Sequence, residues 1–458
     1  MAKTPPSKPH SVAVELADAE LGDARRSARL GVFADRMVAQ PDASFPEMAG
    51  SLGALEAIYR FLNNPAVTPE SVLEPHIVGS VARSEGHGDV IVAHDTTYFS
   101  FDGERVGMGR LNKTDQGFWA HVALAMTPSR EVFGVVGLKY GTRTGPSKWA
   151  KSRRIKDVAP GEPSESLRWP ELAHEADARF DAQRAIHVMD READWFELLE
   201  QMSMQKRRFV VRMAHDRAVE RSGPRVSEVL AGARVVATRE VQLSERAEGS
   251  TAKERATHPG RKPRIATLEM SAATCNVAGA TTGSTLQLNF VHIVEREPPE
   301  GCAAVHWTLS TNEPVSTAEQ VLRIVDAYRA RWTIEEFFKA LKTGCAFEKR
   351  QLGSYQALLV ALAVSLPIAA YLLSLRDMGR HHPNVPAERV LTPAHLAVLI
   401  MIARSPMPAK PTARDVMYAI AGLGGHLPRN GDPGWITLGR GLERLLEAVR
   451  VLRLAKEM

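Results

Sequence analysis

The stretch Tyr328–Lys342, YRARWTIEEFFKALK, combines side chains that could bind phosphate with one that could bind a metal ion. It holds many good helix formers and neither proline nor glycine, which predicts a helix. At about 100° per residue, a phenol, a guanidinium, a carboxylate and an ammonium fall within roughly 60° of one another. These groups belong to Tyr328, Arg331, Glu335 and Lys342. The opposite face is apolar, so an ordinary amphipathic helix with a charged, solvated face is the alternative interpretation.

Two aspartates follow apolar runs that predict β-strands. Asp95 comes after VIVAH and Asp190 after AIHVM. Carboxylates at strand ends lie at the rim of a sheet, where ligands usually bind, although each aspartate alone could be a strand-end cap or a turn former. Together with Glu335 they would form a hard-oxygen site for Mg²⁺. Paired ions at such a site activate one oxygen and stabilise another during phosphoryl displacement, and they offset the repulsion between the carboxylates.

The segments that must position these carboxylates alternate between strand and helix patterns. Three apolar runs predict strands with hairpin links, and helices then alternate with strands. The expected strands are Val90–His94, Trp119–Met126, Val132–Tyr140, Ala185–Met189 and Phe209–Met213, and the expected helices are Glu171–Phe180 and Ala193–Gln205. This order indicates an α/β core, a mixed sheet flanked by helices, in which the first and fourth strands can be neighbours.

Other segments depart from this alternation. Residues 220–310 hold four β-like runs and predict a β-rich insertion: Arg234–Leu243, Ile265–Cys275, Leu286–Val294 and Val305–Leu309. Residues 1–12 have a disordered composition, residues 13–75 read as short helices, and three helical segments follow Leu391. We therefore predict a helical N-terminal domain (1–75), a catalytic core (76–375) and a helical C-terminal domain (376–458).

Composition limits the class of protein. The chain has 458 residues, 44% hydrophobic and 24% charged, which is typical of a folded soluble protein. A formal charge of +5 permits a nucleic-acid partner without requiring one. Three widely spaced cysteines and an N-terminus without an apolar signal core fit a reducing cytoplasm.

One apolar run is near the length of a membrane span. Ala357–Leu375 has 19 residues and no charge. It contains Ser365, Pro367 and Ser374, and its flanks give no clear topology signal. We expect a buried core helix and no membrane partner, with a membrane protein as the alternative.

Three motifs now occur in an order that resembles one known family. They are HDTT (His94–Thr97), DREAD (Asp190–Asp194) and Y-x2-R-x3-E-x6-K (Tyr328–Lys342). They look like the signature of bacterial cut-and-paste transposases of the Y-R-E-K insertion-sequence group. That group shares a DDE core with retroviral integrases and RNase H, so the resemblance implies an RNase H-like fold. DREAD and the four-residue helix signature are specific motifs, whereas HDTT alone is weak.

The resemblance extends over nearly the whole chain. LGDARRSARL (Leu21–Leu30) and AIYRFLNNP (Ala57–Pro65) look like the family's N-terminal DNA-binding region. HWTLSTNEPV (His306–Val315) resembles the segment before the third carboxylate, and IAGLGGHLP (Ile420–Pro428) resembles part of a C-terminal dimerisation region. A homodimer that holds two DNA ends is therefore implied by the resemblance.

The resemblance also implies roles for single residues. Asp95, Asp190 and Glu335 would be the catalytic ligands of two Mg²⁺ ions, for which Mn²⁺ would substitute. Residues implied to bind DNA are Tyr328, Arg331 and Lys342 at phosphates, Trp307 at a flipped base, and Arg25, Arg26 and Arg29 at the transposon end. Trp307 can equally be a core tryptophan of a strand. The arginines of the first helix can equally form a solvated face.

The implied activity is DNA transposition in the bacterial cytoplasm, at the nucleoid. Water would cut the phosphodiester at a transposon end, the freed 3′-hydroxyl would form a hairpin, and after reopening the hydroxyl would attack target DNA. One alternative is a nuclease on the same core. Another is an inactive DNA-binding regulator, against which the three intact carboxylates argue. A tyrosine recombinase fits less well, because carboxylates rather than Arg and His accompany Tyr328.

Overall fold

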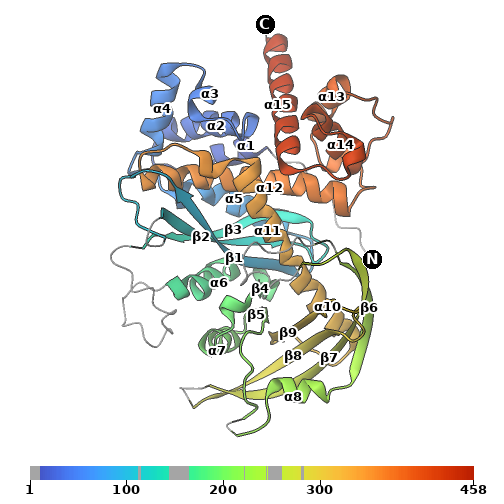
Figure 1. Ribbon diagram of the computed structural model, residues 1–458. Coiled ribbons are helices and arrows are strands. Elements are labelled where there is room, and N and C mark those ends of the chain that lie inside the picture. Colours follow the sequence, from blue (N-terminus) through green and yellow to red (C-terminus); the bar gives the residue numbers. More distant parts are fainter. Residues whose placement is uncertain are drawn as a thin grey trace. The chain divides into compact units, whose positions relative to one another are not determined.

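The computed structural model describes residues 11–111, 115–143, 165–220, 222–243, 245, 260–279 and 283–457 (Figure 1). The chain forms two compact units. The first comprises Met1–Arg184 and Trp332–Met458, and the second Ala185–Arg331. The predicted disordered segment, residues 1–12, falls almost wholly outside the described residues.

Three antiparallel strands form the sheet of the first unit, in the order β3-β2-β1. They are β1 (Val90–Phe101), β2 (Gln116–Met126) and β3 (Val132–Gly141), which confirms the predicted hairpin links. One boundary was wrong, because β1 continues seven residues beyond His94. Asp95 therefore lies within the strand, opposite Val122, and not at its end. The continuation is rich in threonine and aromatic residues, which favour strands, and its Phe99 and Phe101 are buried.

Helices cover both faces of this sheet (Figure 1). α6 (Arg168–Asp177) packs on one face, and α5 (Pro69–Arg83), α11 (Trp332–Lys339) and α12 (Tyr355–His381) pack on the other. The expected N-terminal helices are present, each started by a serine or aspartate cap: α1 (Val12–Ala17), α2 (Ala24–Ala39), α3 (Phe45–Ala49) and α4 (Leu52–Leu62). The three expected C-terminal helices are α13 (Pro393–Ile402), α14 (Ala413–Leu423) and α15 (Trp435–Glu457).

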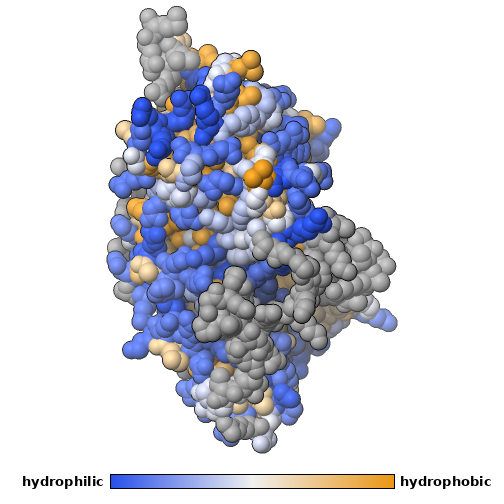
Figure 2. Space-filling view, turned by 90° about the vertical axis from the view of Figure 1, so that its left-hand side faces the viewer, coloured by the Kyte–Doolittle hydropathy of each residue, from blue (hydrophilic) through white to orange (hydrophobic). Residues whose placement is uncertain are grey.

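α12 contains the long apolar run. By length and composition alone this helix could cross a membrane, but 89% of its most apolar window is buried inside the structure. It contacts α4, α5, α14 and β3, so the prediction of a buried helix is confirmed. The predicted boundary at residue 375 falls inside it. On the face drawn in Figure 2, hydrophilic side chains predominate and hydrophobic ones form small scattered groups.

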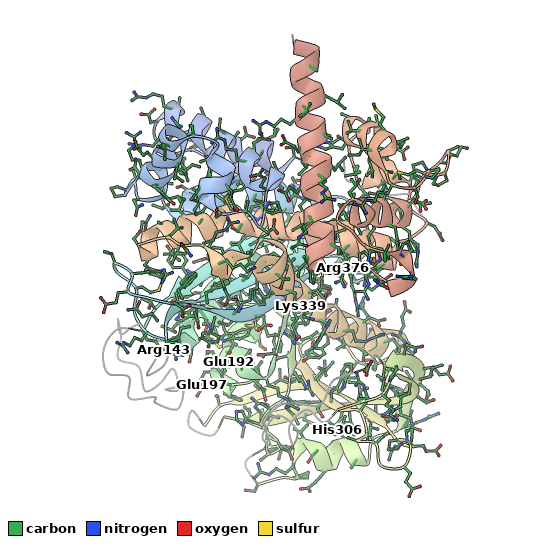
Figure 3. All side chains as sticks on the ribbon, turned by 45° about the horizontal axis from the view of Figure 1, so that its top comes forward. Arg143, Glu192, Glu197, His306, Lys339 and Arg376 are labelled. Atoms are coloured by element: carbon green, nitrogen blue, oxygen red, sulfur yellow. The ribbon has the colours of Figure 1, made fainter. Side chains whose placement is uncertain are left out.

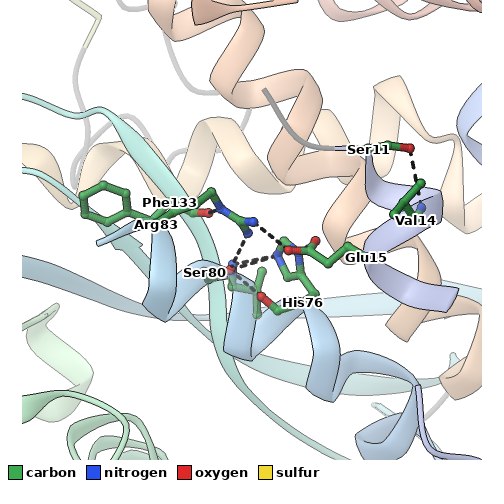
Figure 4. A network of polar contacts seen from close by, with 8 residues as sticks. Ser11, Val14, Glu15, His76, Ser80, Arg83 and Phe133 are labelled. Carbon is green, nitrogen blue, oxygen red and sulfur yellow. Dashed lines mark hydrogen bonds and ion pairs between the residues drawn. The ribbon is translucent and has the colours of Figure 1, made fainter. Parts of the chain in front are cut away.

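A buried polar network ties the first helix to the sheet (Figure 4). His76 on α5 contacts the Glu15 carboxylate on α1 through Nδ1 (2.7 Å) and accepts the backbone N–H of Val135 on β3 through Nε2 (3.1 Å). Arg83 donates to Glu15 (2.6 Å) and to the carbonyl of Phe133 (2.7 Å). These bonds fix α1 and α5 against β3.

The second unit is built on a mixed sheet. Its strands follow the order β4-β5-β9-β8-β7-β6, in which β4 and β5 are parallel and the other pairs antiparallel. They are β4 (Ala185–Met189), β5 (Arg208–Arg212), β6 (Val235–Leu243), β7 (Arg264–Ala278), β8 (Thr285–Glu295) and β9 (His306–Thr311). The helices are α7 (Phe196–Met204), α8 (Val226–Ala231) and α10 (Ala318–Ala330). The predicted β-rich insertion thus extends the sheet of β4 and β5, because β9 pairs with β5.

Candidate active site

Asp95 lies on the face of β1 that is covered by the segment from α11 to Phe347. Alternate residues of a strand share a face, which places Asp95 on the side of Phe99 and Phe101. The rings of Phe99 and Phe101 lie 4.8 and 6.3 Å from the ring of Phe347. The ammonium of Lys342 lies 5.2 Å from the centre of Phe99. The α11 segment therefore packs over the carboxylate-bearing face of the strand.

Glu335 occupies the first turn of α11, which contacts β1. Its neighbours Ile334 and Phe337 are buried, whereas Glu335 and Asp95 are half-buried. The first unit thus brings together the two elements that carry these carboxylates. Carboxylate oxygens at the border between core and solvent can supply hard ligands to Mg²⁺.

The stretch Tyr328–Lys342 is not one α-helix, so this prediction was wrong. α10 ends at Ala330, Arg331 forms its C-cap, and α11 gives way to a π-helix at Ala340–Gly344. The amide of Cys345 bonds to the carbonyl of Ala340 (2.9 Å), five residues back. A π-turn is wider than an α-turn and changes the direction of the side chains after it. A constant 100° step therefore does not describe this stretch.

Lys342 sits in the π-helix and is bound to β1. Its Nζ donates to the backbone carbonyl of Tyr98 (2.7 Å) and lies 3.3 Å from the Glu348 carboxylate. The signature residues are divided between the units, since Glu335 and Lys342 belong to the first and Tyr328 and Arg331 to the second.

Asp190 directly follows β4, as predicted. Its side chain accepts the backbone N–H of Glu192 (2.8 Å) and so caps a short 3₁₀ turn, Arg191–Ala193. The functional interpretation and the cap are therefore both compatible with its position. Asp194, at the end of DREAD, is buried and accepts the backbone N–H groups of Ala214 and His215, which anchors the turn to the segment after β5.

Two arginines and a tyrosine lie near Asp190. β4 and β5 pair in parallel up to Met189 and Val211, so Asp190, which follows β4, and Arg212, the last residue of β5, come next on neighbouring strands. The pKa of Arg191 is lowered by burial and by the charge of Arg212, against the opposing influence of Tyr328 and Asp190. The carboxyl ends of the two strands therefore carry one carboxylate and two guanidinium groups, and the phenol of Tyr328 on α10 lies near Arg191.

Arg212 is a site residue that we did not identify from the sequence. Its Nε is buried and has no hydrogen-bond partner among the described residues. A charged residue at the end of the apolar run FVVR was the available signal. A guanidinium with an N–H group that lacks a partner can donate a hydrogen bond to a phosphate oxygen.

Trp307 lies on β9 in the second unit and is half-buried. Its ring centre is 5.8 Å from that of Tyr328, with a tilt of 53° between the rings. Tyr328 itself is only 8% exposed. The two predicted DNA-binding aromatic residues are therefore neighbours, and Trp307 is neither a fully buried core residue nor a free one.

The N-terminal arginines lie on α2 in different environments. Arg25 is bound to the helix cap Asp23 (2.9 Å), and its hydrogen bonds lower the pKa of Asp23 to about 2. Arg26 donates to the carbonyl of Leu21 (2.9 Å), whereas Arg29 is exposed. Arg25 and Arg29 therefore present guanidinium groups at the helix surface.

A cluster of three or more His, Cys, Asp or Glu side chains arranged to hold a metal ion is not present among the described residues. The carboxylates that we assigned to such a site are Asp95 and Glu335 in the first unit and Asp190 in the second.

Comparisons with known proteins agree with these motifs. Residues 11–67 match the family model described as transposase DNA-binding, and residues 152–373 match the transposase DDE domain. Arg25, Arg26 and Arg29 lie in the first range, and Asp190, Trp307 and the residues from Tyr328 to Lys342 in the second. Asp95 lies outside both ranges, so its assignment depends on the sequence motif and on its place in β1.

One similar solved structure is a cryo-EM structure of a piggyBac transposase synaptic complex with hairpin DNA. The match covers 98% of this chain and 80% of that chain, at 10% identity and a TM-score of 0.39. A likeness of this size supports no argument about the site. The two transposase family models together match well over half of the 458 residues, and the chain therefore belongs to the DDE transposases.

Proposed function

We propose that this transposase binds the terminal inverted repeats of its own mobile element, cuts DNA there in a Mg²⁺-dependent reaction and joins the 3′-hydroxyl ends to target DNA. The contact between β1 and α11 carries the proposal, because it places the elements of Asp95 and Glu335 against each other. Metal binding requires carboxylates from separate parts of the chain to converge, and this contact brings two of them onto neighbouring elements.

Asp95, Asp190 and Glu335 would hold the metal ions. Oxygen ligands of this kind select Mg²⁺, with Mn²⁺ as a substitute. When bound, such ions activate the attacking oxygen and stabilise the leaving one.

The remaining side chains would bind and orient the DNA. Arg212 and Arg191 lie at the end of β5 and just after β4, where a phosphate approaching Asp190 would meet them. Arg331 would bind another phosphate, and Lys342 would do so by exchanging its Tyr98 or Glu348 partner.

Trp307 is half-buried and packs near the buried Tyr328, and an extruded base could stack on the Trp307 ring. Base extrusion is what the proposed hairpin step would require at the cleaved end. The Y-R-E-K insertion-sequence group, a homodimer as the DNA-bound species and a bacterial cytoplasmic location belong to the same proposal.

The proposal is tested by a cleavage and joining assay. The substrate is DNA from the two flanks of the gene's own locus, incubated with Mg²⁺ or with EDTA. We expect metal-dependent nicks at matching inverted repeats, followed by insertion into a second plasmid. Binding without cleavage would instead identify an inactive regulator, and cleavage without joining a nuclease.

Two substitutions sharpen this assay. Glu335→Gln and Asp95→Asn each remove one oxygen ligand, and we expect cleavage to fall more than about 100-fold while end binding stays within a few-fold. Glu348→Gln, an exposed carboxylate near Lys342, is the matched control. Metal-dependent nicking at the wild-type rate in Glu335→Gln would show that Glu335 is not a ligand.

A further inference from the structure

Glu336, the residue after Glu335, is held by two cations. Its carboxylate lies 2.7 Å from Nζ of Lys339 and 2.6 Å from Nη1 of Arg376 on α12. The Lys339 side chain is 54% exposed, whereas those of Glu336 and Arg376 are 17% and 12% exposed. Burial opposes ionisation of Glu336, but hydrogen bonds from both cations lower its pKa. The contact with Arg376 is therefore the buried and less hydrated of the two.

Arg376 also contacts the beginning of α15. Its Nε donates to the carbonyl of Pro433 (3.2 Å), and its guanidinium centre lies 4.4 Å from the ring centre of Trp435. Trp435 starts α15 and is only 7% exposed, so this cation–π contact is shielded from water. Figure 3 labels Arg376 at the lower end of the C-terminal helix, α15. One guanidinium thus joins α11, α12 and α15.

The position of Glu336 determines the direction of Glu335. Adjacent residues of an α-helix are turned by about 100°, so Glu335 can face β1 while Glu336 faces α12. α11 has only eight residues and passes into a π-helix, and so short a helix depends on tertiary contacts for its orientation. A bond that holds Glu336 therefore also fixes the rotation of α11 about its own axis. That rotation sets the direction of the Glu335 side chain.

We propose that Arg376 is a positioning residue for Glu335, and that the start of α15 acts on the metal-binding carboxylate through the chain Trp435–Arg376–Glu336–α11. The inference rests on the proposed role of Glu335 as a metal ligand. It adds that the C-terminal helix helps to set the geometry of this ligand. Loss of the Arg376 bond leaves the Glu335 carboxylate itself unchanged. It allows α11 to rotate about its axis, which changes the direction of that carboxylate.

The test compares Arg376→Gln with Arg380→Gln in the full chain. Arg380 lies one turn further along α12 and binds Asp432 (2.9 Å), in the same loop before α15. Both changes remove one cation and one tie to that loop, but only Arg376 bonds to Glu336. We expect Arg376→Gln to weaken Mn²⁺ binding about tenfold by calorimetric titration without DNA, and to raise the Mg²⁺ concentration for half-maximal cleavage similarly. End binding in EDTA should be unchanged, and Arg380→Gln should stay within about twofold in each measurement.

A double-mutant cycle shows whether the effect passes through Glu336. Glu336→Gln should reproduce the loss, and the variant with both substitutions should be no worse than either alone. Arg376→Lys keeps a cation but not the planar stack on Trp435, and we expect an intermediate Mn²⁺ affinity. If Arg376→Gln fails to fold, Glu336→Gln and Arg376→Lys provide the same comparison.

Three results would overturn the inference: wild-type Mn²⁺ affinity in Arg376→Gln, an equal loss in Arg380→Gln, or additive losses in the cycle. A wild-type protein that binds Mn²⁺ but does not cut DNA would contradict the proposed transposition activity instead. The calorimetric arm therefore separates failure of the positioning role from failure of the proposed function.

Discussion

Nζ of Lys342 donates to the backbone carbonyl of Tyr98, 2.7 Å away and 244 positions earlier in the chain. This bond ties the π-helix after α11 to the strand that contains Asp95. It places a cation beside the face of β1 on which that carboxylate lies, and phosphate binding would require only an exchange of partners.

Replacing Lys342 by methionine removes the ammonium and keeps most of the aliphatic chain. We expect weaker binding of end DNA and a salt dependence whose slope is lower by about one unit, because one phosphate contact is lost. Lys349→Met, at an exposed position seven residues later, is the control. Fluorescence anisotropy across a salt series gives both slopes, and an unchanged slope for Lys342→Met would place its ammonium away from phosphate.

Replacing Arg212 by glutamine removes the guanidinium beside Asp190. We expect single-turnover cleavage to slow by about 100-fold, as is typical when a group that stabilises developing negative charge is lost. The control is Arg296→Gln, which removes a largely exposed arginine paired with Glu269 in the same unit. Equal cleavage rates for the two variants would mean that Arg212 does not contact the reacting phosphate.

We predict that Arg350 contributes to the stability of the fold and not to the chemical reaction. It is 3% exposed and donates to the carbonyls of Pro41, Ala43 and Cys345, so it joins the loop after α2 to the segment after α11. Arg350→Ala would leave buried carbonyls unpaired, and we expect a loss of about 3 kcal/mol in the free energy of unfolding.

Urea denaturation curves of the wild type and of Arg350→Ala measure this loss in the free energy of unfolding. Lys349→Ala, at the exposed neighbouring position, should change the free energy of unfolding by less than about 0.5 kcal/mol. If Arg350→Ala unfolds at the same urea concentration as the wild type, its three carbonyls must find other partners, and the proposed tie between the two segments is wrong.

We predict that His76 makes the free energy of unfolding depend on pH. Its Nε2 accepts the N–H of Val135 and must be unprotonated, so the ring is neutral and its Nδ1–H donates to Glu15. Burial lowers the pKa of His76 below its ordinary value. A lowered folded-state pKa stabilises the fold above the unfolded value of about 6.5, and this contribution is lost as pH falls below that value toward the folded pKa.

We therefore expect the free energy of unfolding to decrease as the pH falls below about 6.5, by no more than about 1.4 kcal/mol per pH unit from this residue. His76→Gln should reduce this slope, because glutamine does not titrate. His174→Gln, at an exposed position on α6, should leave it unchanged. Denaturation curves at several pH values decide the matter, and parallel profiles for the wild type and His76→Gln would contradict the assignment.

Local patterns in the sequence were sufficient for many elements. Ala185–Met189 was predicted with the boundaries that β4 has, because four apolar residues around His187, followed by aspartate, indicate a buried strand and its end. The strands at residues 220–310 were found in the same way, through β-branched and alternating residues. Strand β1 was predicted too short, since its second half alternates polar and buried residues and depends on the packing of Phe99 and Phe101 for its burial.

The sequence alone determined the types and order of the chemical groups: two aspartates after apolar runs, a glutamate in a helical stretch, and the cations around it. Tertiary structure decided what these groups contact. The bond from Lys342 to Tyr98, the parallel pairing that sets Arg212 near Asp190, and the bond from Arg376 to Glu336 all join residues distant in the chain. Periodicity reports only which face of an element is apolar. Long-range contacts depend on how those faces pack, because burial and hydrogen bonding select one partner among many side chains of the same type.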